Sequence, residues 1–489
     1  MPRGFLRWEA PAAAKAAGLA GMLMSAGASE SLPAAVQPMA ERDEAIFLLH
    51  TAAEIEHALL IQYLYAAFSF GDRERRQEAS GGDLDPGRHG LVFGPGGWNR
   101  TIMTIAIEEM CHFITVQNVL RVLGGPPNLD REDLPFRAEF YPFPFALQAA
   151  TKDSLAKYVA AEMPEAPDEA RYPKLREILA RADMAVDAGP INRVGRLFTR
   201  IHQLIGVLPE SAFHAETADS HQAPAGNWQG EELTSLPPNK RAYIVAQFGG
   251  TPAEAKAKVL KVLGMIAAQG EGPGTDAAGS HFDLFYRIYH GFPETNPAYG
   301  PVVWHPALPV PSHPNTSPQP HPSGSDLNGG RITHDLALLW AQLCNTRYRM
   351  LLCAILHSLL IDRNDSNDPA GPQQFAAIVG WSMQPLMKSL RPISNVLTRL
   401  PLANANARRD GRSAVAGAPF ELPYTLSLPD RQAERWQWHR DLIEASRRLR
   451  GAIAADPLTQ GDADALRVLK RIEDGDDAML EDIGAFDQA

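Results

Sequence analysis

Glu109 and His112 lie three positions apart within the stretch IAIEEMCHFITVQNVLRVLGG, residues 105–125. Positions three apart share one face of an α-helix, so both side chains point the same way if this stretch is helical. A carboxylate and a neutral imidazole on one face are two ligands for a divalent metal ion. The surrounding residues are mostly apolar, which predicts that the pair is buried.

The same spacing occurs earlier, in ERDEAIFLLHTAAEIEHALLIQYLYAAFSF, residues 41–70. Each Glu-x-x-His pair is followed, five positions after its histidine, by a glutamine. Burying an unpaired carboxylate costs several kcal/mol, and a divalent cation is a simple compensation for two such pairs in one core. The metal ligands predicted from this repeat are Glu54, His57, Glu109 and His112.

Other polar residues near the two pairs leave alternatives open. Glu56 and Glu108 adjoin the predicted ligands and are either ligands themselves or groups beside the site. His50 lies one helical turn before the first pair and could reach the same metal. Gln62 and Gln117 are expected to be hydrogen-bond partners in the core. A single Glu-x-x-His pair is also compatible with two side chains that only hydrogen-bond to each other.

Helical periodicity extends over most of the chain, and no alternating strand pattern of any length is present, so we predict an all-α protein. The second strong helix, about 99–123, stops at two glycines followed by two prolines. Residues 372–400 are predicted to be helical with kinks or breaks at Pro385 and Pro392, whereas residues 460–489 are acidic and weakly periodic. The predicted parts are 1–40, an N-terminal arm; 41–291, a helical bundle; 292–330, a Pro-rich linker; and 331–489, a C-terminal helical region.

Composition excludes several classes of function. The 489 residues carry a formal net charge of -11, which argues against binding to the phosphate backbone of nucleic acids. Three cysteines without a C-x-x-C pair favour a reducing, cytoplasmic compartment. The apolar helix predicted at 332–361 is interrupted by Asn345, Arg347 and Arg349, so we expect no membrane span. Residues 1–40 resemble a weak export signal, but we interpret them as a flexible or loosely docked arm.

Five motifs occur in an order and spacing that resemble the ferritin-like domain of the iminophenyl-pyruvate dimer synthase group. They are AAEIEHALLIQYLYAAFSF, TIAIEEMCHFITVQNVLRVLGG, YVAAEMPE, IAAQGEG and SHFDLFYRIYHGF, and they cover about residues 45–290. That group includes the proteins that couple two amino-acid-derived imines in violacein, rebeccamycin and staurosporine biosynthesis. The resemblance implies a ferritin-like four-helix bundle with long insertions, followed here by a C-terminal helical domain.

The resemblance also bears on the ligands from the remaining bundle helices. Glu271 follows one predicted helix and His281 opens the next, and the resemblance strengthens both as metal ligands. It places Glu162 beside the site. Arg196 stands in the third helix where such domains often have a carboxylate, and a guanidinium cannot bind a metal cation. A mononuclear and a dinuclear site therefore both stay open, and dimer-synthase activity is not carried over directly.

Two functions follow from these features. The first is a metal-dependent oxidoreductase acting on a small, amino-acid-derived molecule in secondary metabolism. It would use one or two iron ions, or manganese, which prefers the same ligands. The second is a non-catalytic helical binding or scaffold protein with a degenerate or structural metal site. Tyr63 and Tyr65 are read as core aromatics, with a redox role as the alternative, and a homodimer is compatible with the added helical region.

Overall fold

The structure is a computed structural model, and the part of the chain that it describes consists of nine segments. These are 39–78, 82–131, 146–164, 167–185, 194–228, 244–270, 279–320, 326–405 and 407–487. The arm predicted for residues 1–40 therefore lies almost wholly outside the described residues.

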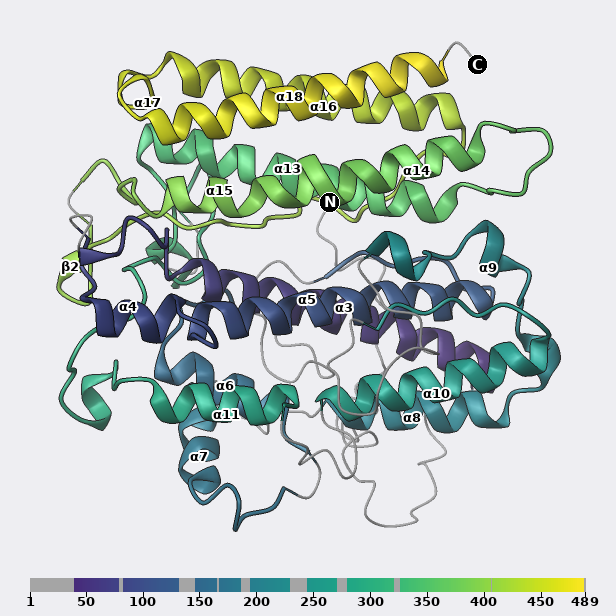
Figure 1. Ribbon diagram of the computed structural model, residues 1–489, viewed down its shortest axis with the longest axis horizontal. Helices are drawn as coiled ribbons and strands as arrows, with labels where there is room; N and C mark the ends of the chain where they lie inside the picture. The colour runs from purple at the N-terminus through teal and green to yellow at the C-terminus, as the bar shows by residue number, and fades with distance from the viewer. Residues whose placement is uncertain are drawn as a thin grey trace. The chain divides into compact units, whose positions relative to one another are not determined.

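The described residues are mostly helical, which confirms the predicted all-α class (Figure 1). The longer helices are α3 (Glu41–Phe68), α4 (Pro86–Phe93), α5 (Trp98–Val122), α6 (Lys152–Ala161), α7 (Leu175–Ala185), α8 (Val194–Val207), α10 (Pro252–Gly270), α11 (His281–Gly291), α13 (Asp335–Leu360), α14 (Gly371–Trp381), α15 (Met387–Leu397), α16 (Gln432–Ala455) and α18 (Ala463–Phe486). Single turns form α9 (Thr217–Ser220), α12 (Asp326–Gly329) and α17 (Pro457–Gln460), and a two-residue hairpin pairs β1 (Arg408–Arg409) with β2 (Arg412–Ser413).

The chain divides into two compact units whose segments alternate along the sequence. Unit 1 comprises Met1–Leu60, Thr104–Phe145 and Thr151–His305, and unit 2 comprises Ile61–Met103, Ala146–Ala150 and Pro306–Ala489. The division falls inside α3 and inside α5, so each of these long helices contributes residues to both units. The four parts predicted along the sequence remain a prediction.

In unit 1, the first half of α3 runs antiparallel to the second half of α5. Arg42, at the start of α3, donates from Nη2 to the carbonyl oxygen of Leu123 at 2.6 Å, just past the end of α5. Further along, the rings of His57 and Phe113 stack with centroids 4.9 Å apart. Gly124 then ends α5 with a φ of 72°, a left-handed conformation that glycine adopts without strain.

Four further helices of unit 1, α6, α8, α10 and α11, contribute to the site. α8 packs against α10, and α6 packs against α7 and α11. Figure 1 shows α8 and α10 running side by side, as it does α6 and α11. These four helices, together with the halves of α3 and α5, carry all the residues of the site described below.

In unit 2, α13 is the central helix and packs against α14, α15 and α16, while α16 packs against α18 (Figure 1). Arg347 interrupts the apolar sequence of α13, but its side chain is fully buried and forms an ion pair with the buried Asp476 of α18. The predicted helix at 372–400 is divided as expected near its first proline. A π-helical segment, Ser382–Leu386, contains Pro385 and joins α14 to α15.

The parts of α3 and α5 that belong to unit 2 are held by residues far along the sequence. The Tyr65 hydroxyl donates to the carbonyl oxygen of Pro311 at 2.6 Å, and the Leu308 amide donates to the carbonyl oxygen of Ser69 at 2.8 Å. Tyr65 is buried, and burial raises the pKa of its hydroxyl. Its contacts are those of a core aromatic residue.

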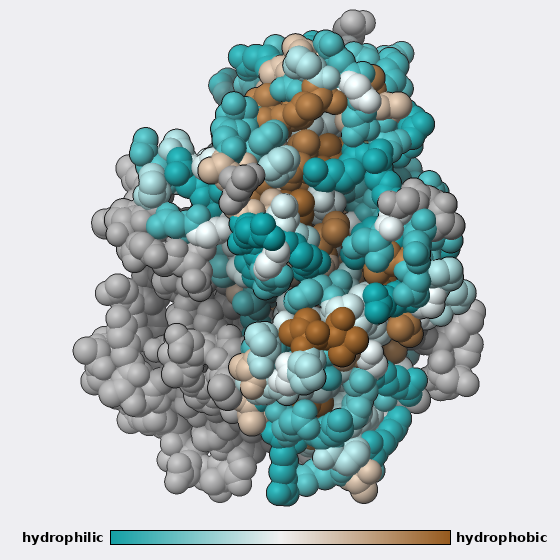
Figure 2. Space-filling view, turned by 90° about the vertical axis from the view of Figure 1, so that its left-hand side faces the viewer, coloured by the Kyte–Doolittle hydropathy of each residue, from teal (hydrophilic) through white to brown (hydrophobic). Residues whose placement is uncertain are grey.

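Among the coloured residues of Figure 2, hydrophilic side chains predominate, and hydrophobic side chains gather in patches between them. Large apolar residues with more than half of their surface exposed are few among the described residues: Leu91, Val207, Val303 and Leu458. No helix in the described segments is both long enough and apolar enough to cross a membrane.

Candidate metal centre

Glu109 lies in the middle of α5 between two histidines from different helices. Its Oε2 atom is 3.0 Å from Nδ1 of His112, which is one turn further along the same helix. Its Oε1 atom is 2.9 Å from Nδ1 of His281, the first residue of α11. The two oxygens of a single carboxylate therefore face two different imidazoles.

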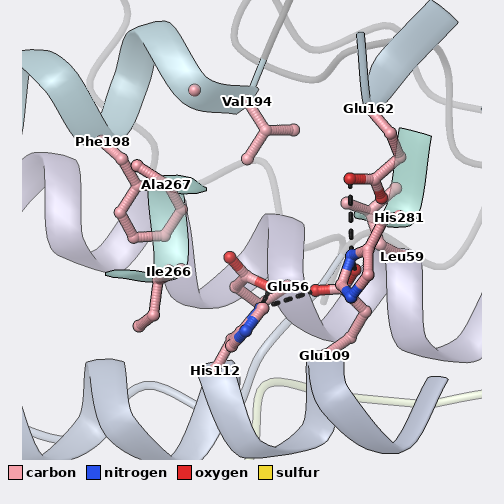
Figure 3. A pocket seen from close by; sticks show the side chains of 11 residues that line it. Glu56, Leu59, Glu109, His112, Glu162, Val194, Phe198, Ile266, Ala267 and His281 are labelled. Atoms are coloured by element: carbon pink, nitrogen blue, oxygen red, sulfur yellow. Dashed lines mark hydrogen bonds and ion pairs between the residues drawn. The ribbon is translucent and has the colours of Figure 1, made fainter. Parts of the chain in front are cut away.

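Each imidazole has a second carboxylate beside it. Glu56 of α3 places Oε2 3.6 Å from Nδ1 of His112, and Glu162, at the end of α6, places Oε2 3.6 Å from Nδ1 of His281. Two sets of three potential ligands result, and within each set the ligand atoms lie within 4.8 Å of one another. We call Glu56, Glu109 and His112 the His112 group, and Glu109, Glu162 and His281 the His281 group. Figure 3 shows these five side chains converging.

Helix ends position two of the five residues. Glu162 is the C-cap of α6, whose other end is fixed by a capping box between Thr151 and Ser154. Ser280 is the N-cap of α11, and its side chain accepts a hydrogen bond from the amide of Asp283. Because His281 directly follows this cap, the cap fixes the direction in which the imidazole leaves the backbone.

The Nε2 atom of each imidazole also has a hydrogen-bond partner. Nε2 of His112 lies 2.8 Å from Oε1 of Gln269 on α10, and Nε2 of His281 lies 2.8 Å from Oε2 of Glu108 on α5. Both acceptors require a proton on Nε2, which leaves the lone pair of a neutral imidazole on Nδ1. Both Nδ1 atoms face the carboxylates, so both imidazoles are oriented as ligands.

The five side chains are almost completely buried, with at most 3% of their surface exposed. Burial and the nearby charge of Glu109 raise the pKa of Glu56 well above its usual value. Burial would lower the pKa of His112, but the hydrogen bond with Glu109 and the nearby carboxylate of Glu56 raise it to about 10. Burial would likewise lower the pKa of His281, and the charge of Glu109 raises it. Without a cation, bound protons therefore balance the buried carboxylates.

The donor atoms fit a divalent cation. Carboxylate oxygens and imidazole nitrogens, with no thiolate in either group, suit iron or manganese. Donor atoms at neighbouring positions of an octahedral cation, each at about 2.1 Å, lie roughly 3 Å apart. The distances of 2.9 to 3.6 Å from Nδ1 of each histidine to the adjacent carboxylates are close to that value. A cation in each group would replace the protons that now balance the charge.

A small pocket opens onto the five residues. Its other lining residues are apolar: Leu59 of α3, Val194, Gly195 and Phe198 of α8, and Ile266 and Ala267 of α10. In Figure 3, Phe198, Ile266 and Ala267 lie to the left of Glu56 and His112, while Glu162 and His281 lie to the right. The polar cluster therefore borders an apolar wall.

The structure places the first predicted pair, Glu54 and His57, outside both groups. Glu54 is half-buried, and its Oε1 accepts a hydrogen bond from Asn128 at 3.4 Å. The His57 ring stacks on Phe113. Two residues along a helix turn the side chain by about 200°, so α3 directs Glu56 and not Glu54 towards His112. The part of Glu54 and His57 in metal binding remains a prediction, and the Discussion describes a variant that tests Glu54.

A different alignment of the two helices identifies the residues that converge. An offset of 53 positions, instead of the 55 of the repeat, pairs Glu56 with Glu109 and places Leu59 opposite His112. Both Glu56 and Leu59 line the pocket. The sequence contains this alignment, and Glu56 is one of the alternatives left open by the sequence analysis. The alignment at an offset of 55 positions matches both a glutamate and a histidine, so the sequence alone favours that offset.

The structure places the remaining predicted residues in different surroundings. Glu109, His112 and His281 are brought together, and Glu162 joins them. Glu271 and the side chain of Arg196 lie outside the described residues. The glutamines are core hydrogen-bond partners, as expected: Gln117 exchanges two 2.7 Å hydrogen bonds with the backbone of Asn128, and Gln62 accepts one from the Ala146 amide.

Comparison with known families matches residues 49–290 to the family described as Ferritin-like. This span contains α3 from its third turn to the end of α11, and with it all five clustered residues. Residues 49–290 belong to the ferritin-like family. The predicted fold is thereby confirmed for this domain.

Two further proteins are similar to this chain in sequence. Dichlorochromopyrrolate synthase from Lentzea aerocolonigenes is 25% identical over 403 residues, 79% of this chain and 36% of that protein. A 2-imino-3-(indol-3-yl)propanoate dimerase from Chromobacterium violaceum is 29% identical over 131 residues, 24% of this chain and 13% of that protein. The chain thus spans about a third of the length of the first relative. No solved structure matches it.

Proposed function

We propose that the ferritin-like domain holds a pair of divalent metal ions, iron or manganese, and oxidises or reduces a small molecule bound in the adjoining pocket. Glu56, Glu109 and His112 would hold one ion, and Glu109, Glu162 and His281 would hold the other. Ferritin-like carboxylate proteins build such centres from Glu and Glu-x-x-His residues that project into the bundle.

The observation that carries the proposal is the position of Glu109. A carboxylate whose two oxygens face imidazoles from two different helices can serve two ions at once. Here each oxygen is about 3 Å from the Nδ1 atom of a different histidine. The two groups are also alike, since each adds one further carboxylate at 3.6 Å. This arrangement supports two neighbouring cation positions.

When bound, redox-active ions with an open position would supply electron transfer and activation of dioxygen or peroxide. The residues of the chain bind and orient the ions and the substrate. Carboxylates and imidazoles would hold the ions, and the acceptors beside the Nε2 atoms, Glu108 and Gln269, would fix the orientation of the imidazoles. The apolar wall formed by Phe198, Ile266 and Ala267 would keep the reacting end of a substrate away from water. An apolar or aromatic group suits this wall.

The substrate class is proposed from the relatives. One of them is named for an imino acid that carries an indole side chain, and both have enzyme names. We therefore propose an amino-acid-derived substrate in secondary metabolism. Because the chain covers only 36% and 13% of these proteins, their complete reactions are not transferred to it.

The test is metal content followed by oxygen consumption. Protein purified without chelators should contain close to two ions per chain, and the iron-loaded protein should consume dioxygen when a reductant is supplied. Replacing His112 with alanine should reduce both quantities. Protein that contains no metal above trace would overturn the proposal. Stoichiometric metal without reactivity towards dioxygen or peroxide would instead support a structural metal in a helical binding protein.

A further inference from the structure

The Nε2 atoms of the two imidazoles in the centre have different kinds of hydrogen-bond acceptor. His281 Nε2 is paired with a carboxylate oxygen of Glu108, and His112 Nε2 is paired with the amide oxygen of Gln269, both at 2.8 Å. Glu108 is 1% exposed, whereas Gln269 is half-buried. In other respects the two groups are matched, because both contain Glu109 and both have a further carboxylate at 3.6 Å.

The chemistry of the acceptor affects the opposite nitrogen of the ring. A carboxylate accepts a stronger hydrogen bond than an amide because it is charged. A stronger pull on the Nε2 proton leaves more electron density on Nδ1, which makes Nδ1 a better metal ligand. Partners of this kind typically change metal affinity by about 10- to 100-fold. The buried position of Glu108 increases the difference, since burial excludes competing water.

We propose that the two metal positions are unequal, with the His281 group binding the first ion because Glu108 supports its histidine. This inference rests on the proposed function, since it requires that both groups bind metal. Glu108 and Gln269 are positioning residues, which act on the ions only through His281 and His112. The His112 group, which Gln269 supports, fills second and empties first.

The first experiment assigns the order of filling. The metal-free full chain is titrated with Co²⁺, and binding is followed by calorimetry and by the visible absorption of the bound ion. We expect two steps that differ in affinity by about 10- to 100-fold. His281→Ala should remove the tighter step, and His112→Ala should remove the weaker one.

The second experiment exchanges the acceptors. Glu108→Gln keeps an oxygen that accepts from His281 but removes its charge, so the tighter step should weaken and approach the weaker one. Gln269→Glu adds a charge behind His112, so the weaker step should strengthen. Glu44→Gln, which removes a carboxylate that pairs with Arg200 in the same unit, should change neither step. Circular dichroism of each metal-free variant confirms folding.

The outcomes separate this inference from the proposed function. Absence of Co²⁺ binding by the unmodified chain would overturn both. Two equal steps would overturn the inequality, and loss of the weaker step in His281→Ala would overturn the order of filling; either result would leave the dinuclear centre standing. Unchanged affinities and absorption in both Glu108→Gln and Gln269→Glu would overturn the role of the acceptors. If Glu108→Gln does not fold, Gln269→Glu decides, because damage to the fold does not strengthen a binding step.

Discussion

At the scale of single residues, Glu109 has the widest effect because it is the one carboxylate shared by both groups. Glu56 and Glu162 each serve one group and occupy matching positions, 3.6 Å from a histidine nitrogen. Replacing either should therefore affect one ion, whereas replacing Glu109 should affect both. This difference distinguishes a bridged pair from two independent sites.

Glu109→Ala is expected to reduce the metal content from close to two ions per chain to near zero. Glu162→Gln is expected to leave about one ion, because the His112 group keeps all of its members. Both values are measured by elemental analysis after loading with Mn²⁺ and removal of excess metal. A Glu109→Ala protein that retains one ion would show that the two groups are independent.

A second pair of variants distinguishes the two glutamates of α3. Glu56→Gln should lose metal because Glu56 lies in the His112 group, and Glu54→Gln should keep it because Glu54 hydrogen-bonds to Asn128 on another side of the helix. Elemental analysis of the two proteins side by side gives the answer. Loss of metal only in Glu54→Gln would restore the ligand set suggested by the repeat.

The sequence identified part of the site, and the missing part has a physical explanation. Glu109 and His112 could be predicted because both lie on one helix, where spacing alone determines direction. Glu56 could not be chosen over Glu54, since the choice depends on how α3 is rotated against α5. The pairing of His281 with Glu108 joins positions 173 residues apart and depends on tertiary packing.

At the scale of helices, the cap of α11 connects stability to the site. The Ser280 hydroxyl accepts from the Asp283 amide at 3.2 Å, and Asp283 in turn accepts from the Gly279 amide at 2.9 Å and from the Tyr172 hydroxyl at 3.2 Å. These bonds fix the first turn of the helix. His281 is the first residue of that turn, so loosening the cap should move a ligand.

Ser280→Ala is expected to lower the free energy of unfolding by about 1 kcal/mol and also to weaken metal binding. Asp85→Ala is the matched control, because Asp85 caps α4 in unit 2 by accepting from the Arg88 amide at 2.9 Å. The control should lose similar stability but keep its metal affinity. Urea unfolding and a Mn²⁺ titration provide the two measurements, and equal affinities in both variants would contradict the expectation.

A pair of buried histidines joins α13 to α16 in unit 2. Nδ1 of His357 lies 3.0 Å from Nε2 of His439, and Nε2 of His357 lies 3.1 Å from Oε1 of Gln432. Burial lowers the pKa of His439 to about 4, and burial together with the neighbouring His439 lowers that of His357 well below its usual value. Both rings are therefore neutral in the folded protein at pH 7.

This pair predicts a loss of stability in acid. In the unfolded chain His439 takes up a proton below about pH 6.5, whereas in the folded chain it does so only near pH 4. Stability is therefore unaffected above pH 6.5 and falls as the pH decreases from 6.5 to 4, by about 3 kcal/mol at 1.4 kcal/mol per pKa unit. Urea unfolding at a series of pH values should show a smaller loss in His439→Gln than in the unmodified chain. Identical pH profiles would refute this role.

The C-terminal helices show what periodicity can and cannot predict. The apolar residues of 332–361 recur at helical spacing and predict α13. Residues 460–489 are only weakly periodic in the sequence, although the buried residues of α18, Ala465, Leu469, Ile472, Asp476, Met479 and Ile483, recur at intervals of four and three. Asp476 breaks this stripe in the sequence, and only the structure shows that it is buried against Arg347.

At the scale of the whole molecule, the two units cannot be separated by a single cut in the chain. Residues 61–103 belong to unit 2, and apart from the short segment Ala146–Ala150 the rest of that unit begins only at Pro306. The Arg76 guanidinium donates to the carbonyl oxygen of Pro306 at 2.7 Å, and the hydrogen bonds of Ser69 and Tyr65 lead to Leu308 and Pro311. A chain that ends after unit 1 would leave buried polar and apolar groups of α3 and α5 without these partners.

A chain truncated after His305 is expected to be much less stable than the full chain, even though it contains every residue of the metal centre. Thermal unfolding and amide hydrogen exchange over residues 61–103 measure the effect. Adding residues 306–489 as a separate chain should restore protection of this segment. A truncated chain with the melting temperature of the full protein would contradict the expectation.

The same interleaving affects how the protein is made. Tyr65 is synthesised 246 positions before its partner Pro311. A ribosome that adds roughly 5–20 residues per second leaves the second half of α3 without that partner for about 10 to 50 s, far longer than a helix needs to form. During this interval an apolar surface emerges from the ribosome uncovered. The yield of folded protein should therefore depend on what shields the growing chain as much as on the stability of the finished fold.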